Sequence, residues 1–180
     1  MAHNIQRCSL AQASELRHLA ITTYDETFSD TNSEALLNAY FEASLNLQKI
    51  SAQLQEQNAE FYFIYSASDK EKKEPAGFLK LNIGNAQTDI MDPEALEIEK
   101  IYLLKKFTAQ GLGKELIKFA IKRAQQQNKT YLWLGVWEHN FSALAFYKKM
   151  GFTQFSTHGF DMGGDIQTDL LLKKQLSTNS

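Results

Sequence analysis

Apolar and polar residues follow two different periods along the chain, and these periods predict its helices and strands. In the first third, Ser9 and Gln12 have the spacing of a capping box at the entry to one helix, and Thr31 and Glu34 repeat that spacing before a second. A polar stretch, residues 25–33, separates the two helical patterns. We therefore expect two helices joined by a polar loop.

From residue 60 onward the apolar period becomes two, which indicates strands. The expected strands span residues 4–8, 60–67, 78–84, 96–104, 130–137, 152–160 and 166–174, and the expected helices span about 10–24, 31–57, 111–127 and 141–150. Strands joined by a whole helix form a parallel crossover, so residues 96–104 and 130–137 are predicted to be parallel neighbours.

The order βααβββαβαββ indicates an α+β (α/β/α) fold, with a mixed central sheet of about seven strands flanked by helices. At 180 residues the chain suits a single domain, predicted over residues 1–174, with a disordered tail at 175–180.

Composition excludes several classes of protein. The net charge is only −2, so the chain has no overall basic field for a phosphate backbone, and we expect no direct nucleic-acid binding. A start without a signal-peptide core, a single Cys8 and no apolar run of about 18 residues predict a cytoplasmic protein without a membrane span. His139, His158 and Cys8 lack metal-ligand spacing, so no metal is expected.

The stretch "TAQGLGKEL" places Gly111 and Gly113 at the entry to a helix. Free N–H groups and the positive end of a helix dipole can hold phosphate there without a cationic side chain. It is no dinucleotide motif, because Leu116 replaces the third glycine, and no P-loop, because Thr108 and Glu115 break that motif. An ordinary helix-entry turn is the alternative.

The strand before this loop carries two glutamates. Period two puts Glu97 and Glu99 on one face of residues 96–104, together with Ile101 and Leu103. Glutamate is disfavoured in strands, so this face either is solvated or borders a cleft.

A later helix, residues 141–150, has Asn140 as its expected N-cap and Gly151 as its left-handed stop. Tyr147 on this helix fits two interpretations. Such a tyrosine is more often a core residue with a satisfied hydroxyl than an acid catalyst.

These features occur in a fixed order. A strand with Glu and "IYL", then "QGLGKEL", another strand and "N…A..FYKKMGF" resemble the GCN5-related N-acetyltransferase (GNAT) superfamily. The stretches "EFYFIYSA", "LEIEKIYL", "YLWLGVWE", "ALAFYKKMGF" and "QTDLLL" are similar to the PaiA-type bacterial polyamine acetyltransferases. The resemblance implies the GNAT fold and an enzyme that transfers the acetyl group of acetyl-CoA to a primary amine, such as spermidine or spermine, by direct attack in a ternary complex.

The resemblance also implies which residues hold coenzyme A. The strand backbone would bind pantetheine, the loop amides the pyrophosphate, and polar residues of the later helix would orient the cofactor. The implied residues are Ile101, Tyr102, Leu103, Ala109, Gln110, Gly111, Leu112, Gly113, Lys114, Asn140 and Lys149. Thr108 replaces the Gln or Arg of the family loop, which weakens any side-chain contact to phosphate at that position.

The chemistry of amine acetylation fits the residues already noted. An alkyl ammonium with a pKa of about 10 must lose a proton before it can attack, and Glu99 or Glu97 can take it. Tyr147 matches the family's acid for the leaving thiolate.

The family places the acceptor site between the first two helices. The implied residues here are Tyr24, Asp25, Glu26, Phe28 and Asp30, which could pair with cations and cover a methylene chain. A solvated acidic turn is the alternative. The partner is then a small-molecule amine, with a homodimer possible. Two other hypotheses remain. The enzyme could acetylate another amine, such as a protein N-terminus or an antibiotic, or the protein could be a non-catalytic regulator that senses coenzyme A.

Overall fold

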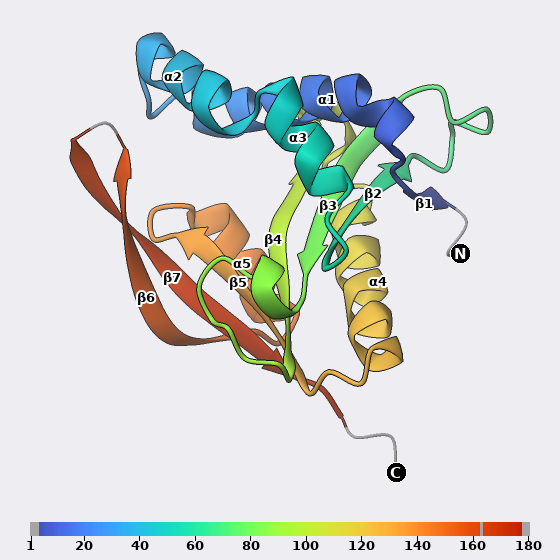
Figure 1. Ribbon diagram of the computed structural model, residues 1–180, viewed down its shortest axis with the longest axis vertical. Coiled ribbons are helices and arrows are strands. Elements are labelled where there is room, and N and C mark those ends of the chain that lie inside the picture. Colours follow the sequence, from blue (N-terminus) through green and yellow to red (C-terminus); the bar gives the residue numbers. More distant parts are fainter. Residues whose placement is uncertain (1–3, 163, 178–180) are drawn as a thin grey trace. The chain divides into compact units, whose positions relative to one another are not determined.

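A seven-stranded mixed sheet flanked by helices forms the fold, as the sequence predicted (Figure 1). The computed structural model describes residues 4–162 and 164–177. The helices are α1 (Ala13–Phe28), α2 (Glu34–Ser44), α3 (Leu47–Leu54), α4 (Leu112–Gln126) and α5 (Phe141–Lys149). The strands are β1 (Ile5–Arg7), β2 (Ala59–Tyr65), β3 (Pro75–Asn82), β4 (Ala95–Leu103), β5 (Tyr131–Trp137), β6 (Thr153–Met162) and β7 (Asp165–Gln175). Neighbouring strands are hydrogen-bonded in the order β1-β2-β3-β4-β5-β7-β6.

The chain divides into two compact units. Unit 1 consists of the described residues of Met1–Leu81 and Lys100–Leu116, and unit 2 of those of Asn82–Glu99 and Ile117–Ser180. Strand β4 belongs to both, because its first half lies in unit 2 and its second half in unit 1.

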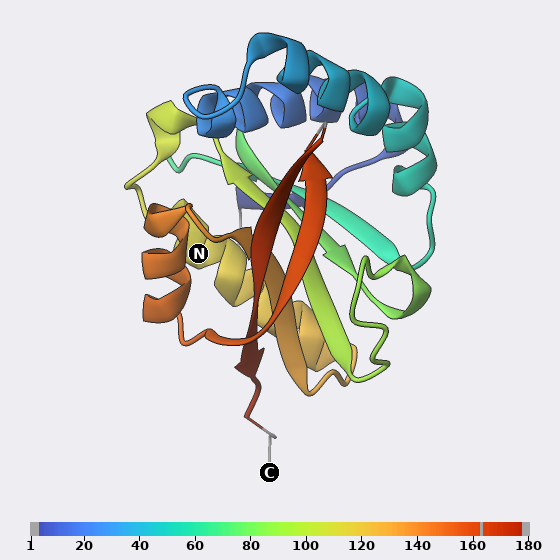
Figure 2. The same cartoon turned by 90° about the vertical axis from the view of Figure 1, so that its left-hand side faces the viewer.

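In unit 1 the helices α1, α2 and α3 pack against β2 and β3 (Figure 2). Their apolar stripes supply Leu16 and Phe41, which bury against Phe63 of β2 and Phe78 of β3. Each such side chain stabilises the fold by about 1.5–3 kcal/mol when it leaves water. The apolar faces of these helices and strands therefore form one apolar layer.

One of the two predicted capping boxes is confirmed. The Ser9 N–H donates to Gln12 Oε1 at 3.0 Å. The second was wrong, because α2 begins after Ser33, whose Oγ accepts from the N–H of Leu36 at 3.2 Å. Thr31 is still part of the turn that closes α1, and its hydroxyl donates to a carbonyl oxygen of that helix.

The long second helical pattern forms two helices instead of one. Helix α2 ends at Ser44, and Asn46 caps α3 by accepting from the N–H of Lys49 at 2.9 Å. The amide nitrogen of Asn46 also donates to the carbonyl oxygen of Glu42, at 2.9 Å. Asparagine competes for backbone groups in this way and favours caps over helix interiors.

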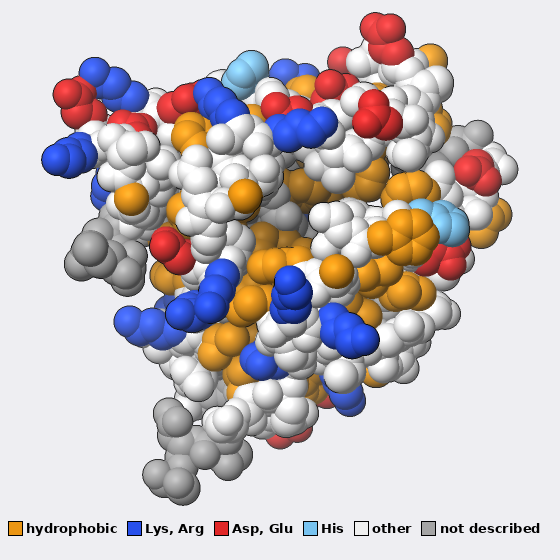
Figure 3. Space-filling model, turned by 180° about the vertical axis from the view of Figure 1, so that it is seen from behind, with side chains coloured by type: hydrophobic (Ala, Val, Ile, Leu, Met, Phe, Trp, Pro, Cys, Tyr) orange, Lys and Arg blue, Asp and Glu red, His pale blue; other side chains and the backbone are white. Residues whose placement is uncertain are grey.

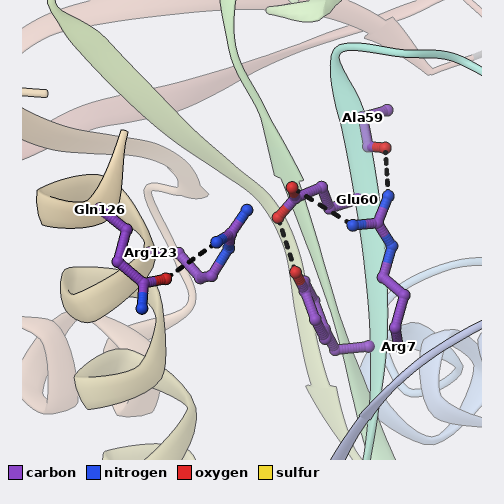
Figure 4. Close-up of polar contacts among 6 residues, drawn as sticks. Arg7, Ala59, Glu60, Arg123 and Gln126 are labelled. Atoms are coloured by element: carbon purple, nitrogen blue, oxygen red, sulfur yellow. Dashed lines mark hydrogen bonds and ion pairs between the residues drawn. The ribbon is translucent and has the colours of Figure 1, made fainter. Parts of the chain in front are cut away.

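Polar contacts hold the short edge strand β1 in place (Figure 4). The Arg7 guanidinium lies 3.2 Å from a carboxylate oxygen of Glu60 and donates to the carbonyl oxygen of Ala59 at 3.3 Å. Tyr62 donates its hydroxyl to the same carboxylate at 2.7 Å. These contacts fix the antiparallel register of β1 on β2.

In unit 2 the parallel pairing of β4 with β5 is confirmed, and it runs from Ala95↔Tyr131 to Glu97↔Trp133. Strand β7 pairs antiparallel with β5 and with β6. Figure 2 shows β6 and β7 as a long twisted hairpin. Parallel partners in register share a face, so Glu97 and Trp133 lie on the same side of this sheet.

The C-terminal end is ordered beyond the predicted boundary at residue 174. Gln175 ends β7, and Leu176, which is buried, donates its N–H to the carbonyl oxygen of Thr130 at 2.9 Å. Residues 178–180 of the predicted tail lie outside the described residues.

Candidate active site

The loop that enters α4 contains two residues with left-handed backbone. Ala109 has a φ of 64° and Gly111 a φ of 80°, and the helix begins at Leu112. Left-handed residues next to right-handed ones turn successive N–H groups to one side, which makes a nest for anions. A left-handed alanine costs about 1–2 kcal/mol, and strain of this kind is common at ligand sites.

The amides at the start of α4 precede the helical hydrogen-bond ladder. The N–H of Glu115 makes a helical bond to Gly111 O at 3.1 Å. By helix geometry, the N–H groups of Leu112, Gly113 and Lys114 therefore have no partner within the helix. Such amides can donate to an anion at the N-terminus of a helix.

Side chains of the loop bond to the protein itself. The Thr108 hydroxyl donates to the carbonyl oxygen of Lys105 at 2.8 Å. Gln110 accepts from the hydroxyl of Ser66 at 3.2 Å. The Thr108 and Gln110 side chains are therefore engaged within the protein.

Strand β3 approaches β4 closely at Gly77. A Cβ on Gly77 would lie 2.2 Å from the carbonyl oxygen of Tyr102, so only glycine fits at this position. The ring of Tyr102 stacks on Phe78 with centroids 5.8 Å apart and lies 6.3 Å from the ring of Tyr24. Gly77 thus helps to fix the strand that was expected to bind pantetheine.

The amides of β4 alternate in direction. The N–H of Leu104 donates to the carbonyl oxygen of Ala76 on β3 at 2.8 Å. Alternation along a strand then puts the N–H groups of Ile101 and Leu103 on the opposite edge of β4. These are the backbone groups expected to meet pantetheine.

One amide joins the two glutamates of β4. Asn82 Nδ2 donates to Glu97 Oε2 at 3.0 Å and to Glu99 Oε2 at 2.7 Å. Both carboxylates therefore lie on the same side of the sheet, as the period-two pattern predicted. Glu97 is only 2% exposed, so the interpretation of a solvated face is wrong for this residue. Glu99 is partly exposed.

Glu97 is held by donors from the segment between β3 and β4. Thr88 donates its N–H to Glu97 Oε2 at 2.9 Å and its hydroxyl to Oε1 at 2.5 Å. Burial raises the pKa of the Glu97 carboxyl, the donors from Thr88 and Asn82 oppose this shift, and the charge of Glu99 adds to it. The net direction is upward, because desolvation is the largest cause.

Thr88 is fixed by its neighbours on both sides. Trp133 donates its ring N–H to Gln87 Oε1 at 2.8 Å, and Gln87 is buried. His158 Nδ1 lies 2.8 Å from Asp89 Oδ2. The donors on Glu97 are thus held by a segment tied to both β5 and β6.

Tyr147 is buried in α5, and its ring packs near Phe146 and Phe152, with centroid distances of 5.3 and 5.8 Å. Its hydroxyl oxygen is not among the buried polar atoms that lack a hydrogen-bond partner in the described part of the chain. Burial raises the pKa of this hydroxyl, so it stays protonated at neutral pH.

The ends of α5 form as the sequence predicted. Asn140 caps the helix by accepting from the N–H of Ala143 at 3.3 Å. Gly151 follows the helix with a φ of 88°. Lys149 is exposed in the last turn, where a cation complements the helix dipole.

The expected acceptor loop begins later than predicted. Helix α1 runs to Phe28, so Tyr24, Asp25 and Glu26 lie on its last turns, and the loop starts at Ser29. The prediction of a loop from residue 24 was wrong, because this stretch keeps helical hydrogen bonds such as that from Ser29 N to Asp25 O, at 2.9 Å.

Aromatic rings gather at this end of α1. Tyr24 lies 4.4 Å from Phe28 and stacks on Tyr40 at 4.4 Å between ring centroids. Glu26 accepts from the backbone N–H of Lys105 at 2.7 Å, so its carboxylate has a structural partner. The exposed carboxylates here are those of Asp25 and Asp30.

The sequence interpretation missed Asn82 and Thr88. Asn82 interrupts the apolar strand "FLKLNIG", and a polar residue at the end of a buried strand was the available signal. Thr88 lies in a segment without any periodic pattern, so only the structure brings it to Glu97.

Within residues 4–162 and 164–177 no group of three or more His, Cys, Asp or Glu side chains could hold a metal ion. Among the described helices, none has the length and apolar character to cross a membrane. On the face seen in Figure 3, Lys and Arg side chains stand as separate groups among neutral and apolar surface.

Comparisons with known proteins agree on one family. The acetyltransferase (GNAT) family matches residues 14–152. An uncharacterized N-acetyltransferase of Lactobacillus delbrueckii subsp. lactis is 44% identical over 154 residues, 86% of each chain. An uncharacterized N-acetyltransferase of Mycobacterium tuberculosis is 29% identical over 94 residues, which cover 52% of this chain and 60% of that relative.

A comparison with solved structures shows a similar fold. The crystal structure of the PaiA N-acetyltransferase of Thermoplasma acidophilum in complex with coenzyme A matches with a TM-score of 0.75 and 19% identity, over 96% of this chain and 98% of that chain. The chain belongs to the GNAT family of acetyltransferases. It is an acyltransferase that depends on acetyl-CoA.

The upward pKa of Glu97 predicts how stability changes with pH. A raised carboxyl pKa means that the unfolded chain releases this proton first as pH rises. The contribution of the group is therefore fully present below its ordinary pKa of 4.5 and is lost as pH rises through the folded value. Relative to Glu97→Gln, the wild-type protein should lose free energy of unfolding from pH 4.5 toward neutral. Urea unfolding of both proteins across this range measures it, and a constant difference would contradict the shift.

Proposed function

We propose that this enzyme acetylates a primary amine of a polyamine, such as spermidine or spermine, by direct attack in a ternary complex with acetyl-CoA. One observation carries the proposal. A continuous stretch, residues 96–116, presents two glutamates on one amide, then the strand amides of Ile101 and Leu103, and then the strained loop at Ala109 and Gly111. An amine acetyltransferase needs a base, a cofactor strand and a phosphate loop.

The loop suits the phosphates of coenzyme A. The N–H groups of Leu112, Gly113 and Lys114 precede the first hydrogen bond of α4, and the loop before them has left-handed residues. Together they can donate to a pyrophosphate. When bound, acetyl-CoA supplies the activated acetyl group. Ile101 and Leu103 offer backbone groups to its pantetheine arm, and Asn140 and Lys149 are the proposed polar contacts from α5.

Glu99 is the proposed base. The acceptor ammonium must lose its proton before the nitrogen can attack, and Glu99 takes that proton directly or through water. It is partly exposed and so can be reached by a substrate, whereas Glu97 is buried with three donors on its oxygens. In this proposal Glu97 takes no proton from the substrate. It accepts hydrogen bonds from Asn82 and Thr88 and so helps to hold them in place.

Tyr147 is the proposed acid. Its hydroxyl stays protonated at neutral pH and can donate a proton to the sulfur as the carbon–sulfur bond breaks. The raised pKa makes the hydroxyl a weaker acid than an ordinary tyrosine, so the role rests on the position of Tyr147 in the family pattern and not on its acidity.

The end of α1 suits a flexible polycation. The faces of Tyr24 and Phe28 can cover methylene groups and attract ammonium groups, and Asp25 and Asp30 can pair with the cations. Glu26 contributes less, because Lys105 N–H already occupies it. The proposal extends to a cytoplasmic enzyme with a small-molecule partner, as a monomer or homodimer.

Consumption of acetyl-CoA with a panel of amines tests the function. Spermidine or spermine should give the highest kcat/KM, compared with a peptide with a free N-terminus and an aminoglycoside. A higher kcat/KM for the peptide or the aminoglycoside would support an acetyltransferase but reject a polyamine as its substrate. Binding of coenzyme A without turnover of any amine would instead favour a regulator.

Replacement of Gly113 tests the phosphate loop. Gly113→Val crowds the amides at the start of α4, while valine is no worse than glycine in a helix. Loss of one charge-assisted hydrogen bond should weaken acetyl-CoA binding by about 10-fold or more in calorimetry. Lys118→Val, on the exposed face of the same helix, is the matched control and should bind normally. Equal affinity in both folded variants would place the cofactor elsewhere.

Tyr147→Phe removes one hydroxyl and retains the ring between Phe146 and Phe152. Turnover should fall by about 100-fold or more, typical of a lost general acid, while acetyl-CoA affinity changes little. The matched control is Tyr131→Phe, because Tyr131 also has a raised hydroxyl pKa but is partly exposed and bonds to Asp92. Full turnover of Tyr147→Phe, with chemistry rate-limiting, would make Tyr147 a core residue.

A further inference from the structure

Asn82 is buried and donates hydrogen bonds from one nitrogen to two carboxylates of unit 2. The orientation of its amide follows from chemistry, because a carbonyl oxygen in that place would face two acceptors, Glu97 and Glu99. The nitrogen must therefore point to the glutamates.

This orientation has a cost. Asn82 Oδ1 is buried and, within the described residues, has no hydrogen-bond donor. Buried acceptors without partners are rare in folded proteins and destabilise them. Packing alone does not account for a side chain kept at this cost, since an apolar residue of similar size would avoid the penalty.

Asn82 is not the only donor on Glu97. Glu97 has two more donors, both from Thr88. The bond to Glu99 is the shorter of the two from Asn82, at 2.7 Å against 3.0 Å. Removal of the Asn82 amide would leave Glu97 anchored by Thr88, but would release the Glu99 carboxylate from this contact.

We propose that Asn82 is a positioning residue for the base: its amide fixes the direction of the Glu99 carboxylate, while Thr88 holds Glu97, which accepts from the same amide. The inference rests on the proposed role of Glu99. The Asn82 amide donates to the Glu99 carboxylate, and such a donor favours the ionised form and fixes the direction of the remaining lone pairs. A base needs both properties.

Asn82→Leu, which removes the donor at similar size, tests this role against Thr88→Val. The control deletes one donor on Glu97 and none on Glu99. Asn82→Leu should lower kcat for spermidine by about 10-fold or more with a smaller change in KM, and should move the acid limb of the pH profile upward. Thr88→Val should keep that limb in place. An unmoved limb and unchanged kcat in folded Asn82→Leu would overturn the proposal.

Asn82→Asp covers the case in which leucine prevents folding. It keeps the shape of the side chain and replaces the donor with a third acceptor, so the acid limb should again move upward. A limb that stays in place would also overturn the proposal. Glu97 also loses a donor in both Asn82 variants, so the Thr88→Val control, which removes a donor from Glu97 alone, separates an effect through Glu97 from one on Glu99.

A titration that needs no turnover separates this inference from the proposed function. Carboxyl ¹³C NMR of the folded protein, with the Glu99 signal assigned from Glu99→Gln, follows the carboxylate directly. Glu99 should titrate at higher pH in Asn82→Leu or Asn82→Asp than in the wild-type protein. Equal midpoints would reject the role of Asn82 even in an active enzyme. If the Glu99 midpoint shifts but the protein acetylates no amine, the effect of Asn82 on Glu99 is supported and the proposed function is rejected.

Discussion

The buried carboxylate of Glu97 is the constraint on which the candidate site depends. A carboxylate out of water requires donors, and Asn82 and Thr88 supply them. Thr88 can serve only if the segment between β3 and β4 is held in place, which the Gln87–Trp133 and Asp89–His158 contacts achieve. The same Asn82 amide reaches Glu99. One buried charge therefore connects the local structure of β3, β4 and their connecting segment to the placement of the proposed base.

Strand β4 then relates this polar group to the cofactor elements through the chain itself. Residues two apart on a strand lie about 7 Å apart on one face, so Glu99 is followed at once by Ile101 and Leu103. The chain continues into the loop at Ala109 and Gly111, whose left-handed backbone orients amides before α4. The proposed base, the proposed pantetheine strand and the proposed phosphate loop therefore follow one another closely along the sequence.

Much of this could be predicted from the sequence, and the exceptions have physical reasons. Period two placed Glu97 and Glu99 on one face, and the glycine at 151 and the asparagine at 140 marked the ends of α5. The break at Asn46 was missed because apolar periodicity continues through it, although a side-chain cap there outweighs helix propensity. Thr88 could not be found, because its role depends on a contact nine positions away in a segment without a pattern. Burial, which separates the roles of the two glutamates, is a property of the folded sheet.

The central claim is that Glu99 moves the proton while Glu97 holds the structure. The most direct test is kcat for spermidine acetylation as a function of pH in Glu99→Gln and Glu97→Gln. Glu99→Gln should lower kcat by about 100-fold or more and remove the acid limb of the profile, because the base is lost. Glu97→Gln should retain an acid limb. Retention of both kcat and the limb in Glu99→Gln, or loss of the limb only in Glu97→Gln, would contradict the account and move the search for the base to Glu97, Asp25, Glu26 or an ordered water.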